Sequence, residues 1–290
     1  MPLLFLFLFV HMANSFVNPV SFSADDFSIT AIEPWFKVKV QVIKEYLQAF
    51  TLQTTGLADE IIFLDLQAGS GFYSLGAQKQ IVLMPSLEAL KVDPPFHKVI
   101  LCEENPEYAR ALKVRVNKYF RQRNVLLFEE DVNSLIRKLH HFVPPSKRNH
   151  KVAPLCLVDP HHFSISFSLI EQLANLGFSF IVPYTFPLNN RLNYKHYQRE
   201  AAQTVQSFVG PNVAAVMTAN SNTEFYKKLV RSHQNNLLTL GMQVSLSAHK
   251  SEYTQMDVPV FYVGMYSKLV SAKEIVKDVK VSGIQQTELF

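Results

Sequence analysis

Short apolar runs alternate with amphipathic segments along most of the chain. In residues 35–50, apolar side chains recur at three- and four-residue spacing, which predicts an amphipathic helix. Short apolar runs predict strands at 61–66, 98–103, 124–129, 154–159 and 178–182. Strands that alternate with helices in this way predict a parallel sheet covered by helices on both faces.

Helix-start signals support this interpretation. The tripeptide Asn105-Pro106-Glu107 combines a capping side chain, a proline suited to the first helical position and a carboxylate near the positive end of the helix. A capping-box pattern that begins at Ser221 predicts a long helix ending at Gly241.

The end of the chain departs from the parallel pattern. Two strand-like segments, 242–249 and 258–267, are separated by a polar stretch, which predicts an antiparallel pair at one edge of the sheet. Five parallel strands followed by such a pair are the layout of the α/β, Rossmann-like class I methyltransferase fold. We expect a poorly ordered N-terminal extension at 1–34, a methyltransferase-like domain at 35–275 and a C-terminal tail at 276–290. Within the domain, we expect an insertion after the fifth strand, at 186–220.

Composition narrows the class of protein. The chain is 48% hydrophobic, enough for a sizeable core, and its formal charge of +4 permits an acidic partner without requiring one. Cys102 and Cys156 each lie inside an apolar run, which is typical of buried thiols in a reducing compartment and favours a cytoplasmic location. Their predicted strands lie about two strand spacings of 4.8 Å apart, so we expect no disulfide between them.

The N-terminus carries an apolar run, Leu3–Val10, of eight residues, whereas a membrane-spanning helix needs roughly 20. No transmembrane segment is therefore expected. A signal peptide is the alternative, with weak support because no basic residue precedes Leu3. The favoured interpretation is a disordered or peripheral extension.

The first buried run leads into a loop that contains Asp65, Gly69 and Gly71. Ligands of open α/β sheets bind beyond the carboxyl ends of the strands, where glycine lets the backbone approach a ligand closely. Ser74 replaces the third glycine of a dinucleotide fingerprint, which disfavours NAD. S-adenosylmethionine (SAM) has no pyrophosphate for the loop to bind, so it does not need the third glycine. The alternative is that the glycines serve only a tight turn.

Three further carboxylates, Glu103, Asp131 and Asp159, follow the ends of other predicted strands. Each one alone is more simply explained as a helix cap. Together they would meet at one rim of a parallel sheet, where Glu103 is placed for the ribose hydroxyls of SAM and Asp131 for its adenine. The predicted cofactor-binding residues are Asp65, Gln67, Ala68, Gly69, Gly71, Glu103 and Asp131.

The predicted catalytic residues are Asp159, His161 and His162, in the stretch VDPHHF. A carboxylate, a rigid turn and two imidazoles can handle a proton or hold a planar amine. The alternative is a turn whose histidines are merely exposed. No further Cys or His cluster supplies zinc ligands, so no metal is expected.

Two groups of basic residues are interpreted as solvent-exposed. The loop 140–151 is rich in Lys, Arg and His, and its charge could also meet phosphate. The second group is a predicted water-facing helical stripe made of Lys113, Arg115, Lys118, Arg121 and Arg123.

Taken in order, six segments resemble the three-Cys-motif partner protein family, a Rossmann-like group with the SAM-dependent methyltransferase fold. The resemblance covers roughly residues 35 to 270 and rests on the order of the motifs. It implies a SAM-type fold and a partner protein that carries a cysteine motif. The segments are KVQVIKEYLQAF (39–50), FLDLQAGSG (63–71), CEENPEYARAL (102–112), EEDVNSLI (129–136), LVDPHHF (157–163) and VPVFYVGMYSK (258–268).

Two departures from the family pattern lie at the expected pocket. His161 and His162 stand where the family favours an aromatic residue and a glycine, and the segment 78–90 replaces a turn of small residues. Three functions therefore remain open. They are a SAM-dependent methyltransferase of unknown acceptor, such as a nucleic-acid base, a non-catalytic interaction partner with the same fold, and a nucleic-acid-binding module that uses the basic loop.

Overall fold

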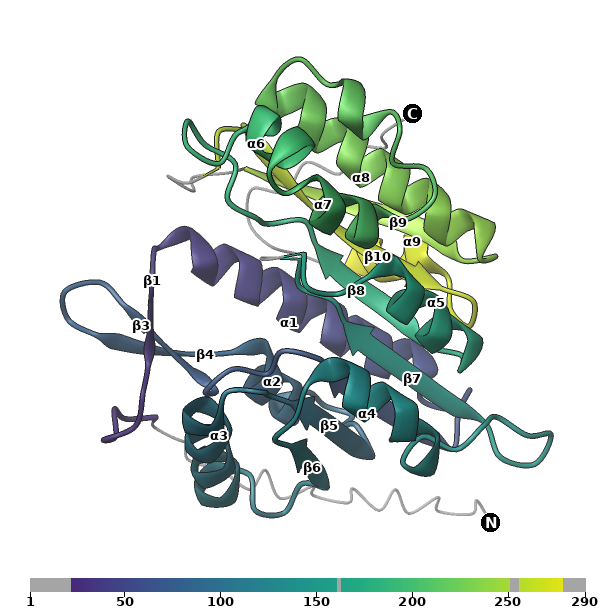
Figure 1. The fold of residues 1–290 in the computed structure, drawn as a ribbon. Helices are drawn as coiled ribbons and strands as arrows, with labels where there is room; N and C mark the ends of the chain where they lie inside the picture. Colours follow the sequence, from purple (N-terminus) through teal and green to yellow (C-terminus); the bar gives the residue numbers. More distant parts are fainter. Residues whose placement is uncertain (1–21, 161–162, 251–255, 279–290) are drawn as a thin grey trace, which may run out of the picture.

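The computed structural model describes residues 22–160, 163–250 and 256–278. These residues form a seven-stranded sheet with the strand order β6-β5-β2-β7-β8-β10-β9 (Figure 1). The strands are β2 (Glu60–Asp65), β5 (Lys98–Cys102), β6 (Val125–Phe128), β7 (Val152–Leu157), β8 (Ser179–Pro183), β9 (Gln243–Lys250) and β10 (Val260–Ser267).

The pairing in this sheet is that of the Rossmann-like methyltransferase fold. The strands from β6 to β8 pair in parallel, and β10 pairs antiparallel with both β8 and β9. The predicted fold class, the five parallel strands and the antiparallel edge are thereby confirmed. Because β7 ends at Leu157, earlier than expected, Asp159 lies in the loop after the strand.

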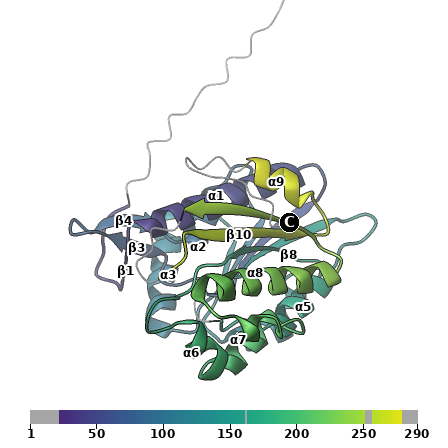
Figure 2. The ribbon, with the colours of Figure 1, turned by 90° about the horizontal axis from the view of Figure 1, so that it is seen from above.

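Helices cover the sheet on both faces. They include α1 (Trp35–Thr54), α2 (Pro85–Glu88), α3 (Pro106–Tyr119), α4 (Val132–Lys138), α5 (Phe167–Asn175), α6 (Tyr194–Arg199), α7 (Ala202–Val209), α8 (Asn222–Thr239) and α9 (Ala272–Asp278). Helix α1 packs against α2 and α9 on one face, while α5, α7 and α8 lie together on the other (Figure 2). The predicted caps are present, since Asn105 accepts hydrogen bonds at the start of α3 and Ser221 at the start of α8.

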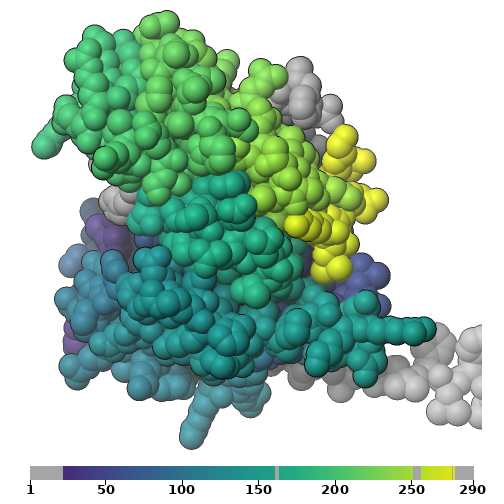
Figure 3. All heavy atoms as spheres, turned by 45° about the vertical axis from the view of Figure 1, so that its right-hand side comes forward, coloured from purple at the N-terminus to yellow at the C-terminus, as the bar shows by residue number. Residues whose placement is uncertain are grey.

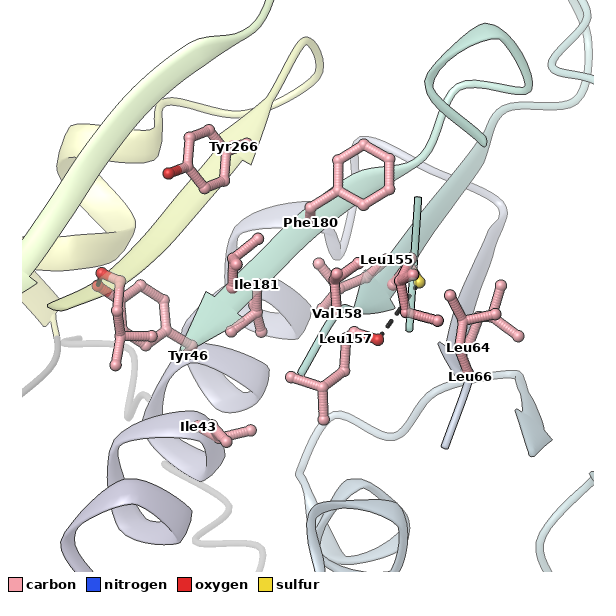
Figure 4. Close-up of a cluster of buried hydrophobic side chains, with 14 of the residues drawn as sticks. Ile43, Tyr46, Leu64, Leu66, Leu155, Leu157, Val158, Phe180, Ile181 and Tyr266 are labelled. Atoms are coloured by element: carbon pink, nitrogen blue, oxygen red, sulfur yellow. Dashed lines mark hydrogen bonds between the residues drawn. The ribbon is translucent and has the colours of Figure 1, made fainter. Parts of the chain in front are cut away.

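The core lies between these helices and the central strands. It includes Ile43 and Tyr46 of α1 and Ile181 of β8, whose side chains are fully buried (Figure 4). Cys102 and Cys156 are free and buried on the strands that flank β2, which confirms that they form no disulfide with each other. Burial raises the pKa of the Cys102 thiol to about 12, so it stays protonated and unreactive at neutral pH.

A second, small sheet was not predicted from the sequence. It consists of β1 (Thr30–Ile32), β3 (Phe72–Leu75) and β4 (Gln80–Leu83), and β3 begins directly after the glycine loop. The strands are short and lie partly at the surface, so their apolar pattern is weak. Strand β1 falls within the expected N-terminal extension, and its pairing with β3 attaches this part of it to the domain.

The segment between β8 and α8, predicted as an insertion, contains α6, α7 and a 3-10 turn at Val216–Thr218. Figure 3 shows this part, in green, at one end of the molecule, with the region of β5 and β6, in blue, toward the other. Within the described ranges, no helix has both the length and the apolar character that crossing a membrane requires.

The prediction that the basic stripe of α3 faces water is wrong at Arg115, whose side chain is fully buried. Its guanidinium donates to both carboxylate oxygens of Asp25, at 3.0 and 2.5 Å, and to the backbone oxygen of Ser70 at 2.7 Å. It also stacks 4.3 Å from the ring centroid of Phe72. Helical periodicity does not reveal this contact, because Asp25 lies 90 residues away in the sequence.

Candidate functional site

A cavity of about 160 Å³ opens where β2, β5 and β6 end. Parallel strands bring their carboxyl ends to one edge of the sheet, so the residues after each strand meet there. Three predicted cofactor residues, Gln67, Glu103 and Asp131, line this cavity, which is also lined by Leu66, Glu104, Glu130, Val132, Asn133, Ser164 and Ile165.

Glu103 ties the end of β5 to the glycine loop. Its carboxylate accepts hydrogen bonds from the N–H of Gly69 at 2.8 Å and of Asn105 at 2.9 Å. The residue is only 9% exposed, and burial raises the pKa of its carboxyl group. Each carboxylate oxygen can accept a second hydrogen bond, so Glu103 retains acceptor capacity toward the cavity.

Two further lining residues, Asp131 and Gln67, present a helix-capping carboxylate and a side-chain amide. Asp131 caps α4 by accepting from the N–H of Ser134 at 3.0 Å, as the cap interpretation predicted, and it is exposed. The hydrogen bond from the Ser134 hydroxyl lowers the pKa of Asp131, which keeps it ionised. Gln67 donates through its Nε2 to the Ser164 hydroxyl at 2.8 Å. The cavity wall therefore offers mainly hydrogen-bond acceptors.

Two positions of the loop require glycine because of their backbone angles and because neighbouring side chains leave no room for a Cβ. Gly69 and Gly71 have φ of +63° and +91°, a region that other residues rarely adopt. A Cβ on Gly69 would lie 2.6 Å from the Met84 sulfur, and one on Gly71 would lie 2.9 Å from Leu87. The N–H of Gly71 also points to the Met84 sulfur at 3.2 Å. The tight-turn explanation thus has direct support, and Met84 fills the space over Gly69.

Ala68 contributes through its backbone. Its N–H donates to the carbonyl of Cys102 at 2.9 Å, and its own carbonyl accepts from the Ser86 hydroxyl at 2.8 Å. Hydrogen bonds therefore join the loop both to β5 and to α2.

Asp65 and Asp159 do not line the cavity, and instead belong to a cluster of charged groups in which Asp65 is buried and Asp159 is partly exposed. Asp65 is 4% exposed, and burial, followed by the negative charges of Asp159 and Glu103, raises its pKa to about 7. The N–H of Gln67 donates to Asp65 and opposes this shift, as does the positive charge of Lys39. This carboxyl group therefore titrates near neutral pH.

Lys39 of α1 is the residue that sequence reasoning missed. It is 2% exposed, and its ammonium lies 2.5 Å from Oδ2 of Asp159. The other oxygen, Oδ1, is buried and has no hydrogen-bond partner in the described part of the chain. The signal was present, because Lys39 stands three residues after Phe36 and four before Ile43, on the apolar stripe of the helix.

His161 and His162, the other predicted catalytic residues, lie outside the described residues. Among the residues that the structure does describe, no group of three or more His, Cys, Asp or Glu side chains is arranged to hold a metal ion. The cation that reaches Asp159 in the structure is the Lys39 ammonium.

No family model matches the sequence, and no curated protein matches it either. Membership of the three-Cys-motif partner family therefore stays a prediction. Among solved structures, a Legionella pneumophila protein of family DUF519 is 12% identical, with 83% of this chain and 90% of that one covered and a TM-score of 0.49.

Two further structures are described as methylating enzymes. An rRNA methylase from Streptococcus thermophilus is 10% identical over 80% of this chain and 95% of that one, with a TM-score of 0.37. An O-methyltransferase from Bacillus cereus, in complex with S-adenosylhomocysteine (SAH), is 12% identical over 77% and 80%, with a TM-score of 0.40. These similarities are remote, and the methyltransferase-like fold of this protein follows from the order and direction of its own strands.

Proposed function

We propose that the protein binds SAM at the carboxyl edge of the sheet and transfers its methyl group to an acceptor held at Asp159. One observation carries the proposal. A cavity lined by Gln67, Glu103 and Asp131 lies where β2, β5 and β6 end, in a sheet with the strand order of the methyltransferase fold. Ligands of open α/β sheets bind at this edge.

The residues present fit a nucleoside. Glu103 is nine-tenths buried and has acceptor capacity for two ribose hydroxyls. Asp131 can accept from the exocyclic amine of adenine, and Gln67 offers both a donor and an acceptor. At about 160 Å³ the cavity is smaller than the roughly 300–1,000 Å³ of small-molecule sites, so it does not account for the whole cofactor. The amino-acid end would extend along the glycine loop, where the flexible side chain of Met84 must turn aside.

Asp159 is suited to hold the acceptor. SAM, when bound, supplies an electrophilic methyl group on a sulfonium. Asp159 pairs with the Lys39 ammonium through Oδ2, and a carboxylate accepts hydrogen bonds and does not donate them. Its buried Oδ1 lacks a donor among the described residues, so an acceptor that presents an N–H or O–H would satisfy it.

Calorimetric titration with SAM and with SAH tests this function. A hydrogen bond to a charged group contributes about 1.5–3 kcal/mol, so Glu103→Ala should weaken SAM binding by roughly 10- to 150-fold. The matched control is Glu129→Ala, which removes an exposed carboxylate that does not line the cavity. If well-folded wild-type protein binds neither ligand at millimolar concentration, the proposal is wrong.

The second candidate is a methyltransferase-fold protein that does not catalyse and acts as a partner of a protein with a cysteine motif. The position of Met84 over Gly69 favours it, because this side chain fills part of the space that a cofactor would need. An assay of methyl transfer separates the two candidates, because the titration measures binding alone. SAM binding without detectable methyl transfer to any acceptor, or no SAM binding at all, would support the partner role.

A nucleic acid bound through the basic loop 140–151 would not lie at the cavity. The N–H groups of Asp59 and Glu60, at the start of β2, both donate to the carbonyl of Lys151. The loop therefore lies at the amino edge of the sheet, opposite the cavity. A nucleic-acid acceptor would have to reach Asp159 over a different surface.

A further inference from the structure

Lys39 has more hydrogen-bonding capacity than the structure uses. Its ammonium carries three N–H donors, and the hydrogen bond found for it is the one to Oδ2 of Asp159. The residue is 2% exposed, so bulk water does not satisfy the other donors. The ammonium also lies 5.2 Å from the ring centroid of Phe36. Buried polar groups are normally paired, so the spare donors of Lys39 suit an anionic ligand.

Two carboxylates surround this cation. Oδ1 of Asp159 is buried and lacks a donor within the described ranges, and Asp65 is 4% exposed with a raised pKa. Spare donors and spare acceptors thus lie together at the end of the glycine loop. An α-amino acid group carries both complementary charges, a carboxylate for the ammonium of Lys39 and an ammonium for the carboxylates.

We propose that Lys39 binds the carboxylate of the amino-acid end of SAM while it still holds Asp159. This inference rests on the proposed function and extends its site from the sheet edge to α1. With the nucleoside beside Glu103, the amino-acid end must pass along the loop after Asp65, which is where Lys39 reaches. One ammonium would then bridge the cofactor and the residue assigned to the acceptor.

The competing explanation is structural. The buried pair of Lys39 and Asp159 joins α1 to the loop after β7, 120 residues away, and could serve only to fix the helix there. In that case, loss of Lys39 would lower the stability of the protein and weaken every ligand of the cavity to a similar degree.

Binding of two ligands that differ in one group separates these explanations. Titrations of SAM and decarboxylated SAM, which lacks only the carboxylate, are compared in wild type, Lys39→Met and Lys37→Met. Lys37 lies on the same helix but is exposed, so its variant is the matched control. We expect Lys39→Met to weaken SAM roughly 10- to 150-fold and to leave decarboxylated SAM unchanged, because the lost contact is to a charged group.

Equal weakening of both ligands by Lys39→Met would overturn the inference and leave the proposed function intact. Failure of wild type to bind either ligand would overturn both. If Lys39→Met does not fold, Lys39→Arg provides the same comparison, because it keeps the charge but changes the donor geometry. The ratio of the two affinities should then change, and a ratio identical to wild type would count against a contact with the carboxylate.

Discussion

At the scale of single residues, the site is defined by charges that are buried beside one another. Asp65, Glu103 and Lys39 are each at most 9% exposed. Backbone N–H groups donate to the two carboxylates and Lys39 pairs with Asp159, which compensates in part for the loss of water. Burial raises the pKa of both carboxyl groups, Asp65 and Glu103, so their charge depends on pH.

We expect the carboxyl group of Asp65 to make the stability of the protein depend on pH. Its pKa is 3.8 when unperturbed and about 7 in the folded protein, so between these values the folded state binds more protons than the unfolded state. Stability should therefore fall as pH rises from about 4 to 7. Asp65→Asn keeps an oxygen for the N–H of Gln67 and removes the titration, so it should be more stable than wild type above pH 7.

Urea unfolding at about pH 5 and pH 8 measures this effect. The exposed carboxylate of Asp26 provides the control variant, Asp26→Asn, which should change the pH dependence little. If the stability of Asp65→Asn falls with pH as steeply as that of wild type, the ionisation of Asp65 is not responsible.

At the scale of elements, one buried guanidinium joins three parts of the fold. Arg115 of α3 binds Asp25 in the N-terminal segment and the carbonyl of Ser70 in the glycine loop, and it stacks on Phe72 of β3. It also donates to the carbonyl of Ser28, just before β1. The loop that precedes the small sheet is thus held by α3 as well as by β5.

Removal of this guanidinium should be costly. Arg115→Met removes the guanidinium that donates to the Asp25 carboxylate and the Ser70 carbonyl, and breaking a buried ion pair costs about 3–5 kcal/mol of stability. Lys113→Met, on the exposed side of the same helix, should change the free energy of unfolding by no more than about 0.5 kcal/mol. Urea denaturation compares the two, and similar losses in both variants would contradict a central role for Arg115.

At the scale of the whole molecule, the cavity lies among residues that follow three different strands, so a ligand there contacts parts of the sheet that must fold together. Ligand binding to the folded state alone raises the free energy of unfolding by about 2.7 kcal/mol at a hundred times the dissociation constant. The positive charge of the basic loop 140–151 does not contribute to ligand binding in this cavity, because the loop lies at the opposite edge of the sheet.

Saturating SAM should therefore raise the melting temperature of wild type by roughly 5–10 °C, given about 2–4 °C per kcal/mol for a domain near this size. In Glu103→Ala the shift at the same SAM concentration should be much smaller. Differential scanning calorimetry checks both values. A shift of equal size in the two proteins would place SAM outside the cavity lined by Glu103.

Local patterns predicted the main elements well. The five parallel strands, the caps at Asn105 and Ser221 and the antiparallel edge are all present, because burial of a strand and capping of a helix depend on residues a few positions apart. The hairpin of β3 and β4 was missed because short, half-exposed strands carry little pattern.

The sequence alone determined the fold class and the edge of the sheet where carboxylates such as Glu103 and Asp131 gather, because strands that alternate with helices run parallel and share one carboxyl edge. Only the tertiary structure decided which charges meet. Lys39 reaches Asp159 across 120 residues and Arg115 reaches Asp25 across 90. No local pattern encodes such pairs, since their stability depends on burial that exists only once helices and sheet have packed together.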